Sequence, residues 1–219
     1  MIYNVVKRDL IIASRSGGSA FHGLIFFGLF ISLVSISLGG TNDVLNPLSP
    51  AIIWLAIIFS TMLSYPNIFQ EDFKDGNLLQ LKLSGMSSLD ICIAKSVSFS
   101  IQSIFPLLLS VPIAAILLNM AFIDIKKILI TLIIATPGLT VYGVLSSAIM
   151  AKIRGGTFFI VLITSPFLIP LLIFGLENMN SATEIKIFTT ELQVLIGLSL
   201  ISTAIGLPAS AAALNTNME

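Results

Sequence analysis

Charged residues are scarce in this chain of 219 residues, since Asp, Glu, Lys and Arg make up 10% of it and hydrophobic residues 56%. A soluble domain carries roughly 25% charged residues, so a water-covered globular surface is excluded. The formal net charge of +0 leaves no basic surface for nucleic acid. The composition therefore predicts an integral membrane protein.

Reactive side chains are equally few. Cys92 is the single cysteine and His22 the single histidine, which excludes an internal disulfide and a cysteine metal cluster. The sequence contains neither a G-x-x-x-x-G-K-[ST] phosphate loop nor an H-E-x-x-H zinc motif. We therefore expect no catalytic residues, no metal site and no ATPase site. Cys92 is expected to fill apolar space, and His22 to be a polar residue at headgroup level rather than a haem ligand.

Six apolar segments are long enough to cross a bilayer, for which a helix needs roughly 20 apolar residues. They predict an all-α membrane protein with spans near residues 20–38, 50–68, 96–120, 128–150, 155–176 and 192–214. Pro47 and Pro50 suit the start of the second helix, and Trp54 is expected to anchor its outer end at the membrane surface. No internal repeat is evident, so residues 1–219 are expected to form a single membrane domain.

Prolines interrupt four of the predicted spans at Pro106, Pro112, Pro137, Pro166, Pro170 and Pro208. Each removes a backbone hydrogen bond that neighbouring helices or water must replace. The pattern predicts kinked helices packed in a bundle, although proline is also simply commoner in membrane helices. In the sixth span, Gly206 with Ser210, or Ala209 with Ala213, would allow another helix to approach closely.

The first 15 residues have the pattern of an amphipathic helix. Ile2, Val6, Leu10 and Ala13 form one stripe, and the cations lie on other faces. We expect this helix to lie along the membrane surface against anionic lipids; a frayed tail is the alternative. We do not expect a signal peptide, because the following apolar run is long enough to span and no cleavage site follows it.

Lysine and arginine placement predicts the orientation. Lys7, Arg8, Arg15, Lys74, Lys82, Lys95, Lys152 and Arg154 fall on one side of the predicted spans, and Lys126, Lys127 and Lys186 on the other. The excess places both termini and the loop between spans two and three in the cytoplasm. No ionisable residue falls in the middle of a predicted span, which argues against a proton-coupled or ion-coupled carrier.

Residues 70–90 hold the densest run of charge and lie between two uncharged segments. Their pattern predicts two short amphipathic helices, joined by a kink at Gly76 with φ above zero and closed by Ser84-Gly85. We expect the apolar side of this segment to bind a partner. Leu78 and Leu81 would enter a groove on that partner, and Asp72 and Asp75 would contact its rim.

Several motifs resemble those of ABC-2 type exporter permeases and, more narrowly, the CcmB family of haem-exporter permeases. The ABC-2 resemblance is carried by Glu71-x-x-x-x-Gly76-x-Leu78-x-Gln80-Leu81 and Ser88-x-x-x-x-x-Ala94-Lys95. The CcmB resemblance adds Pro50-x-Ile52-Ile53-Trp54, Asp72-x-x-Asp75-Gly76, Thr136-Pro137, and Arg154-Gly155-Gly156 leading to Pro166-x-x-x-Pro170. It covers nearly the whole chain. Lys126 and Lys127 depart from the charge asymmetry that such permeases show.

The resemblance implies a partner and a cargo. The segment between spans two and three would be a coupling helix that docks on a separate ATP-binding subunit, CcmA-like, which carries the ATP. Its interface residues here would be Glu71, Asp72, Asp75, Gly76, Asn77, Leu78, Gln80 and Leu81. CcmC-like and CcmD-like membrane subunits would assemble with it, and a CcmE-like chaperone would receive haem. No haem-ligand motif is visible, and six spans imply a homodimer.

Other readings of the sequence stay open. An ABC-2 permease for a lipid, drug or polysaccharide would have the same architecture, and so would a scaffold subunit of a haem-handling assembly that transports nothing. Within the CcmB family, either movement of haem across the bilayer or release of the haem-loaded chaperone would be the driven step. We expect a bacterial inner membrane in preference to a mitochondrial one.

Overall fold

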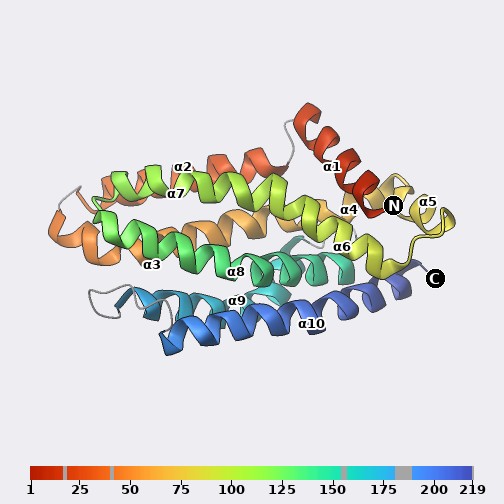
Figure 1. Cartoon of the computed structure of the whole chain (residues 1–219). Coiled ribbons are helices and arrows are strands. Elements are labelled where there is room, and N and C mark those ends of the chain that lie inside the picture. The colour runs from red at the N-terminus through yellow and green to blue at the C-terminus, as the bar shows by residue number, and fades with distance from the viewer. Residues whose placement is uncertain (17–18, 40–41, 154–156, 181–188, 219) are drawn as a thin grey trace.

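The computed structural model describes residues 1–16, 19–39, 42–153, 157–180 and 189–218. These residues are almost all helical and include no strand. They form an elongated bundle whose long helices run roughly side by side, with both chain termini at the same end (Figure 1). The prediction of an all-α fold is confirmed.

The helices in chain order are α1 (Ile2–Ser16), α2 (Ser19–Ser37), α3 (Asn42–Ser64), η1 (Tyr65–Ile68), α4 (Gln70–Lys74), α5 (Asn77–Leu83), α6 (Ser88–Phe99), η2 (Ser100–Ile104), α7 (Phe105–Leu117), α8 (Phe122–Ile149), α9 (Thr157–Asn180) and α10 (Thr190–Met218). Five stretches are long and apolar enough to cross a membrane: Leu45–Lys74, Ser88–Leu117, Phe122–Ile149, Phe158–Met179 and Thr190–Met218. These support five of the six predicted spans. The apolar stretch of α2, Phe21–Ser37, is shorter.

Helix α8 is central to the bundle, because it contacts α10, α9, α7, α6, α3 and η1. Glycines on α8 and α10 bring other side chains close to the helix backbone. A Cβ at Gly143 would overlap the ring of Tyr65, whose hydroxyl donates a hydrogen bond of 2.9 Å to the carbonyl of Leu139. Gly206 of α10 packs against Val141 in the same way. Gly206 and Ser210 are both buried, which confirms that pair as a contact face.

Two predictions about the second span are wrong. Helix α3 begins at Asn42, so Pro47 and Pro50 lie inside it; an internal proline is tolerated in a membrane helix where surrounding groups satisfy the freed carbonyl. Trp54 does not anchor the outer surface, because it is 0% exposed. Its indole ring occupies the space that a side chain at Gly175 of α9 would need. Trp54 is therefore a core residue of the bundle.

The third span starts earlier than the predicted residue 96. Helix α6 begins at Ser88 after an N-cap at Ser87, whose hydroxyl accepts a hydrogen bond of 3.1 Å from the backbone of Asp90. This cap extends the helix beyond its apolar part, so Lys95, which the charge count assigned to the loop, lies within it. The helix then passes through the π-helical turn η2 into α7, where Pro106 is the second residue.

Candidate functional site

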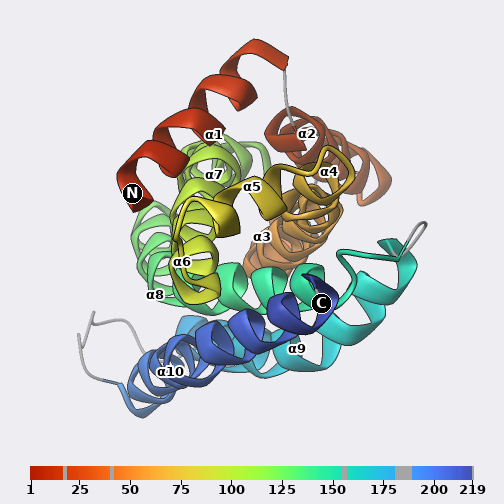
Figure 2. The ribbon, with the colours of Figure 1, turned by 90° about the vertical axis from the view of Figure 1, so that its right-hand side faces the viewer.

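The segment that follows η1 forms the end of the bundle that faces the viewer in Figure 2. It folds into the two short helices α4 and α5, and Gly76 between them has a φ of 72°. Gly85, which follows α5, has a φ of 87°. Both glycines adopt a left-handed backbone that other residues rarely reach, so the predicted kink and the predicted end of the segment are confirmed.

The eight predicted interface residues divide between the surface and the interior. Glu71, Asp75 and Gln80 are exposed, whereas Gly76, Asn77 and Leu81 are half-buried. Asp72 and Leu78 are buried inside this chain, at 8% and 1% exposure. The expectation that their side chains enter or line a partner is therefore wrong. Whether the segment as a whole is an interface stays a prediction.

The exposed apolar surface of α5 consists of Leu79 and Leu83, which are 55% and 79% exposed. Residues four apart lie on one face of a helix, so these two leucines point the same way. This face could be found in the sequence, because Leu79 and Leu83 are four residues apart. The pair Leu78 and Leu81 fitted a helical face equally well, and only packing against the rest of the bundle distinguishes the two.

Beneath this surface lies a cluster of four charged side chains, which we call the charge cluster: Arg8 and Asp9 of α1, Asp72 of α4 and Lys95 of α6. The ammonium of Lys95 lies 2.8 Å from Asp9 Oδ2 and forms a second ion pair with Asp72. Arg8 Nη2 lies 2.8 Å from Asp9 Oδ1 and 3.0 Å from Asp72 Oδ2. Two cations and two carboxylates thus balance one another.

Neighbouring groups complete the surroundings of the charge cluster. Asn77, one of the predicted interface residues, donates a hydrogen bond of 3.1 Å to Asp72 Oδ1. Burial alone would lower the pKa of Arg8, but the carboxylates of Asp72 and Asp9 outweigh burial and raise the pKa above its ordinary value. Arg8 therefore stays charged at any physiological pH. A cavity of about 80 Å³ beside the cluster is lined by residues that include Asp9, Glu71, Asp72, Lys95 and Gln102.

Helix α1 is turned differently from the prediction. Its most buried residues are Val5 at 4% and Asp9 at 7% exposure, whereas Ile2 and Val6 of the predicted stripe are only partly covered. The reason is that α1 packs against α6, so Asp9 must turn inward to meet Lys95. Ile11 and Ile12 are left exposed. The sequence pattern did not reveal an inward carboxylate.

The remaining candidate residues lie apart from the charge cluster. His22 is exposed near the start of α2. Cys92 is buried on α6, which confirms it as an apolar filler. Within the described residues, His, Cys, Asp and Glu nowhere gather in groups of three that could hold a metal ion. Arg154, Gly155 and Gly156, which carried part of the family resemblance, lie outside the described residues.

Comparison with known proteins gives one consistent result. The profile of the CcmB protein family matches residues 1–217. Heme exporter protein B of Bradyrhizobium diazoefficiens is 30% identical over 216 residues, which cover 98% of this chain and 97% of that protein. Heme exporter protein B of Rhodobacter capsulatus is 30% identical over 215 residues, covering 98% and 99%. The protein of that name from Haemophilus influenzae is 33% identical over 178 residues, covering 81% and 80%.

Proposed function

This chain belongs to the CcmB family, and from that premise we propose that it is the permease subunit of an ATP-driven haem-export or haem-release complex for c-type cytochrome biogenesis. The observation that carries the proposal is similarity along almost the full length of relatives named heme exporter protein B. Haem would be the cargo rather than a resident cofactor. The sequence has no phosphate loop, so ATP would be bound and hydrolysed on a separate subunit.

We propose six spans, with α2 as the first. At 1.5 Å per residue, the 19 residues of α2 extend about 28 Å, close to the ~30 Å hydrocarbon core. An even number of spans agrees with the two termini lying at one end of the bundle (Figure 1). The lysine and arginine excess supports placing that end in the cytoplasm. Helix α1 would then lie along the cytoplasmic surface, with Lys7 and Arg15 toward lipid headgroups.

The outer face of α4 and α5 is the proposed docking surface for a CcmA-like ATP-binding subunit. Leu79 and Leu83 would be its apolar centre, since they are the exposed leucines of α5. Glu71, Asp75 and Gln80 would form its polar rim. Of the other predicted interface residues, Asp72 and Leu78 would support the surface from beneath, and Gly76, Asn77 and Leu81 would shape it.

The wider assembly follows from the family. Six spans supply half of a typical transporter, so a homodimer is proposed. CcmC-like and CcmD-like membrane subunits, and indirectly a CcmE-like haem chaperone, would complete the complex in a bacterial inner membrane. Either transport of haem itself or release of the loaded chaperone would be the step that docking drives.

Copurification tests the docking surface. Burying a leucine contributes roughly 1.5–3 kcal/mol and ~1.4 kcal/mol is one decade in affinity. Leu79→Asp or Leu83→Asp should therefore weaken recovery of the ATP-binding subunit about ten-fold or more. Formation of c-type cytochromes should fall with it. Leu89→Asp, at an exposed leucine of α6 outside this face, is the matched control and should behave like the wild type.

Two outcomes would contradict the proposal in different ways. Unchanged recovery of the ATPase with Leu79→Asp and Leu83→Asp would place docking elsewhere on the chain. Normal c-type cytochromes in cells that lack this protein would exclude the haem function itself. Leu78→Asp is unsuitable for this test, because its side chain is buried within the chain and the substitution would disturb α5 directly.

A further inference from the structure

We propose that Lys95 is a positioning residue that joins α1 and α4 to the third membrane helix, so that movement of the docking segment is carried into the membrane through the charge cluster. The transmission part rests on the proposed function, since it needs a partner that moves α4. The joining of the three elements stands on the geometry alone.

Lys95 lies where three separate parts of the chain meet. Its side chain is 9% exposed, and it pairs with Asp9 of α1 and with Asp72 of α4. Arg8 strengthens the same junction, because it lies on α1 and contacts Asp72 of α4, which is 64 residues later in the sequence. A push on α4 therefore reaches Asp72, then the ammonium of Lys95, and then the backbone of α6.

The charge cluster is stiff because its charges balance and three of its four side chains, Asp9, Asp72 and Lys95, are buried, while Arg8 is 31% exposed. Each carboxylate contacts both cations, so neither carboxylate can leave without exposing unpaired charge. Removing one partner of a buried ion pair is strongly destabilising, since the other charge stays buried without compensation. Movement of the three elements as a unit is therefore favoured over their separation.

A change of helix type lies one turn beyond Lys95 along the same span. Residues Ser100–Ile104 form the π-helical turn η2, and Pro106 follows it without a backbone N–H to donate. The hydroxyl of Ser103, within this turn, is buried without a hydrogen-bond partner. Kinks in long helices arise at prolines and π-turns, so η2 is the point at which α6 can tilt relative to α7.

The packing on the two sides of η2 differs. Helix α6 contacts α1, α8 and α10, whereas α7 contacts α2, α3 and α8. Tilting at η2 would therefore move α6 together with α1 and α4, while α7 stays against α2 and α3. This division makes Lys95 the connection between the docking surface and the part of the third span that can move.

A distance measurement tests the join without any partner protein. Cys92 is the single cysteine and is buried, so Cys92→Ala gives a background for spin labels at Ile11 of α1 and Lys74 of α4. Both positions are exposed. In the purified full-length chain, Lys95→Met should broaden the distance distribution and lengthen its mean. Lys127→Met is the matched control, because Lys127 is equally buried but lies at the other end of the bundle, and it should leave the distribution unchanged.

A second measurement tests transmission. In the assembled complex, Lys95→Met should keep the ATPase bound but lower c-type cytochrome formation about ten-fold or more, within the range typical of coupling between sites. Asp72→Asn added to Lys95→Met restores charge balance, because Arg8 and Asp9 remain as a pair. The double variant should accumulate to the protein level of the wild type, and its formation of c-type cytochromes should remain low.

The outcomes separate the two proposals. An unchanged distance distribution in Lys95→Met overturns the join, whatever the protein transports. A broadened distribution with normal cytochrome formation, or recovery of cytochrome formation by the double variant, overturns transmission and leaves the haem function standing. If c-type cytochromes form without this protein, the proposed function fails, and the distance measurement alone still decides whether Lys95 joins α1 to α4.

Discussion

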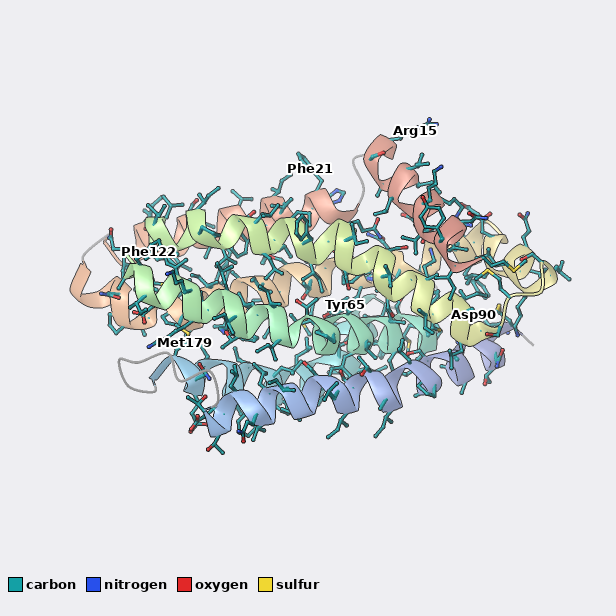
Figure 3. The ribbon with its side chains drawn as sticks, viewed as in Figure 1. Arg15, Phe21, Tyr65, Asp90, Phe122 and Met179 are labelled. Atoms are coloured by element: carbon teal, nitrogen blue, oxygen red, sulfur yellow. The ribbon has the colours of Figure 1, made fainter. Side chains whose placement is uncertain are left out.

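Lys95 and Lys127 are both 8% exposed and lie at opposite ends of the bundle. The carboxylates that pair with Lys95 come from α1 and α4. Lys127 forms an ion pair of 3.7 Å with Asp124, three residues earlier on the same helix. In Figure 3, Asp90 marks the end that holds Lys95, and Phe122 marks the end that holds Lys127. The ion pairs of Lys95 thus link three separate elements, and the pair of Lys127 with Asp124 lies within α8.

The middle of the bundle is held by shape rather than charge. Tyr65, labelled between the two ends in Figure 3, sits over Gly143. Thr164 of α9 donates a hydrogen bond of 2.6 Å to the hydroxyl of Ser146 on α8. Such contacts fix helices at one separation, because a buried interior has little room to adjust. The charged end is held instead by the ion pairs that join α1, α4 and α6.

Gly143→Val is expected to have the largest effect on the packed middle of the bundle. The new side chain would overlap the ring of Tyr65, which is fully buried, and overpacking of this kind costs typically 1–3 kcal/mol. We expect the yield of monodisperse protein and its thermal midpoint to fall sharply. Gly197→Val on α10 is the control, because nothing lies within 4 Å of a Cβ at Gly197. Equal losses in both variants would mean that the close approach of Tyr65 does not hold the middle together.

His22→Ala should have a much smaller effect. The histidine is exposed near the start of α2, away from both the charge cluster and the packed middle. A lone imidazole at that level is replaceable, so cells with this variant should make near-normal amounts of c-type cytochromes. Loss of holocytochrome at a normal level of the protein would show that His22 contacts the cargo.

Reporter fusions change no packing and show which end of the bundle faces the cytoplasm. Fusion points after Asn42, Gly85, Asp124, Arg154, Glu184 and Glu219 should alternate, beginning outside and ending inside. This order would place the charge cluster in the cytoplasm and the pair of Lys127 with Asp124 outside. A cytoplasmic signal after Asp124 would place the pair of Lys127 with Asp124 in the cytoplasm. It would also remove the basis for docking at α4 and α5.

Local features of the fold were predictable from the sequence. The left-handed Gly76 followed from turn chemistry within a few residues, and the burial of Cys92 from its apolar character. Features that depend on another helix were not predictable. Trp54 is buried because Gly175 on α9 leaves room for its ring. Asp9 turns inward because it forms an ion pair with Lys95 of α6. The periodicity of α5 allowed two leucine faces, and only tertiary packing selects Leu79 with Leu83 as the exposed one.

The long sequence separation within the charge cluster has a consequence for biosynthesis. Arg8 precedes Asp72 by 64 residues, and a ribosome adding roughly 5–20 residues per second takes about 3–13 s to make that stretch. During this interval Arg8 has Asp9 beside it as a partner, but not Asp72. The cluster closes after Lys95 has emerged, when α2 and α3 have already been made. The ion pairs that join α1 to α4 and α6 can therefore form only after Lys95 has been made.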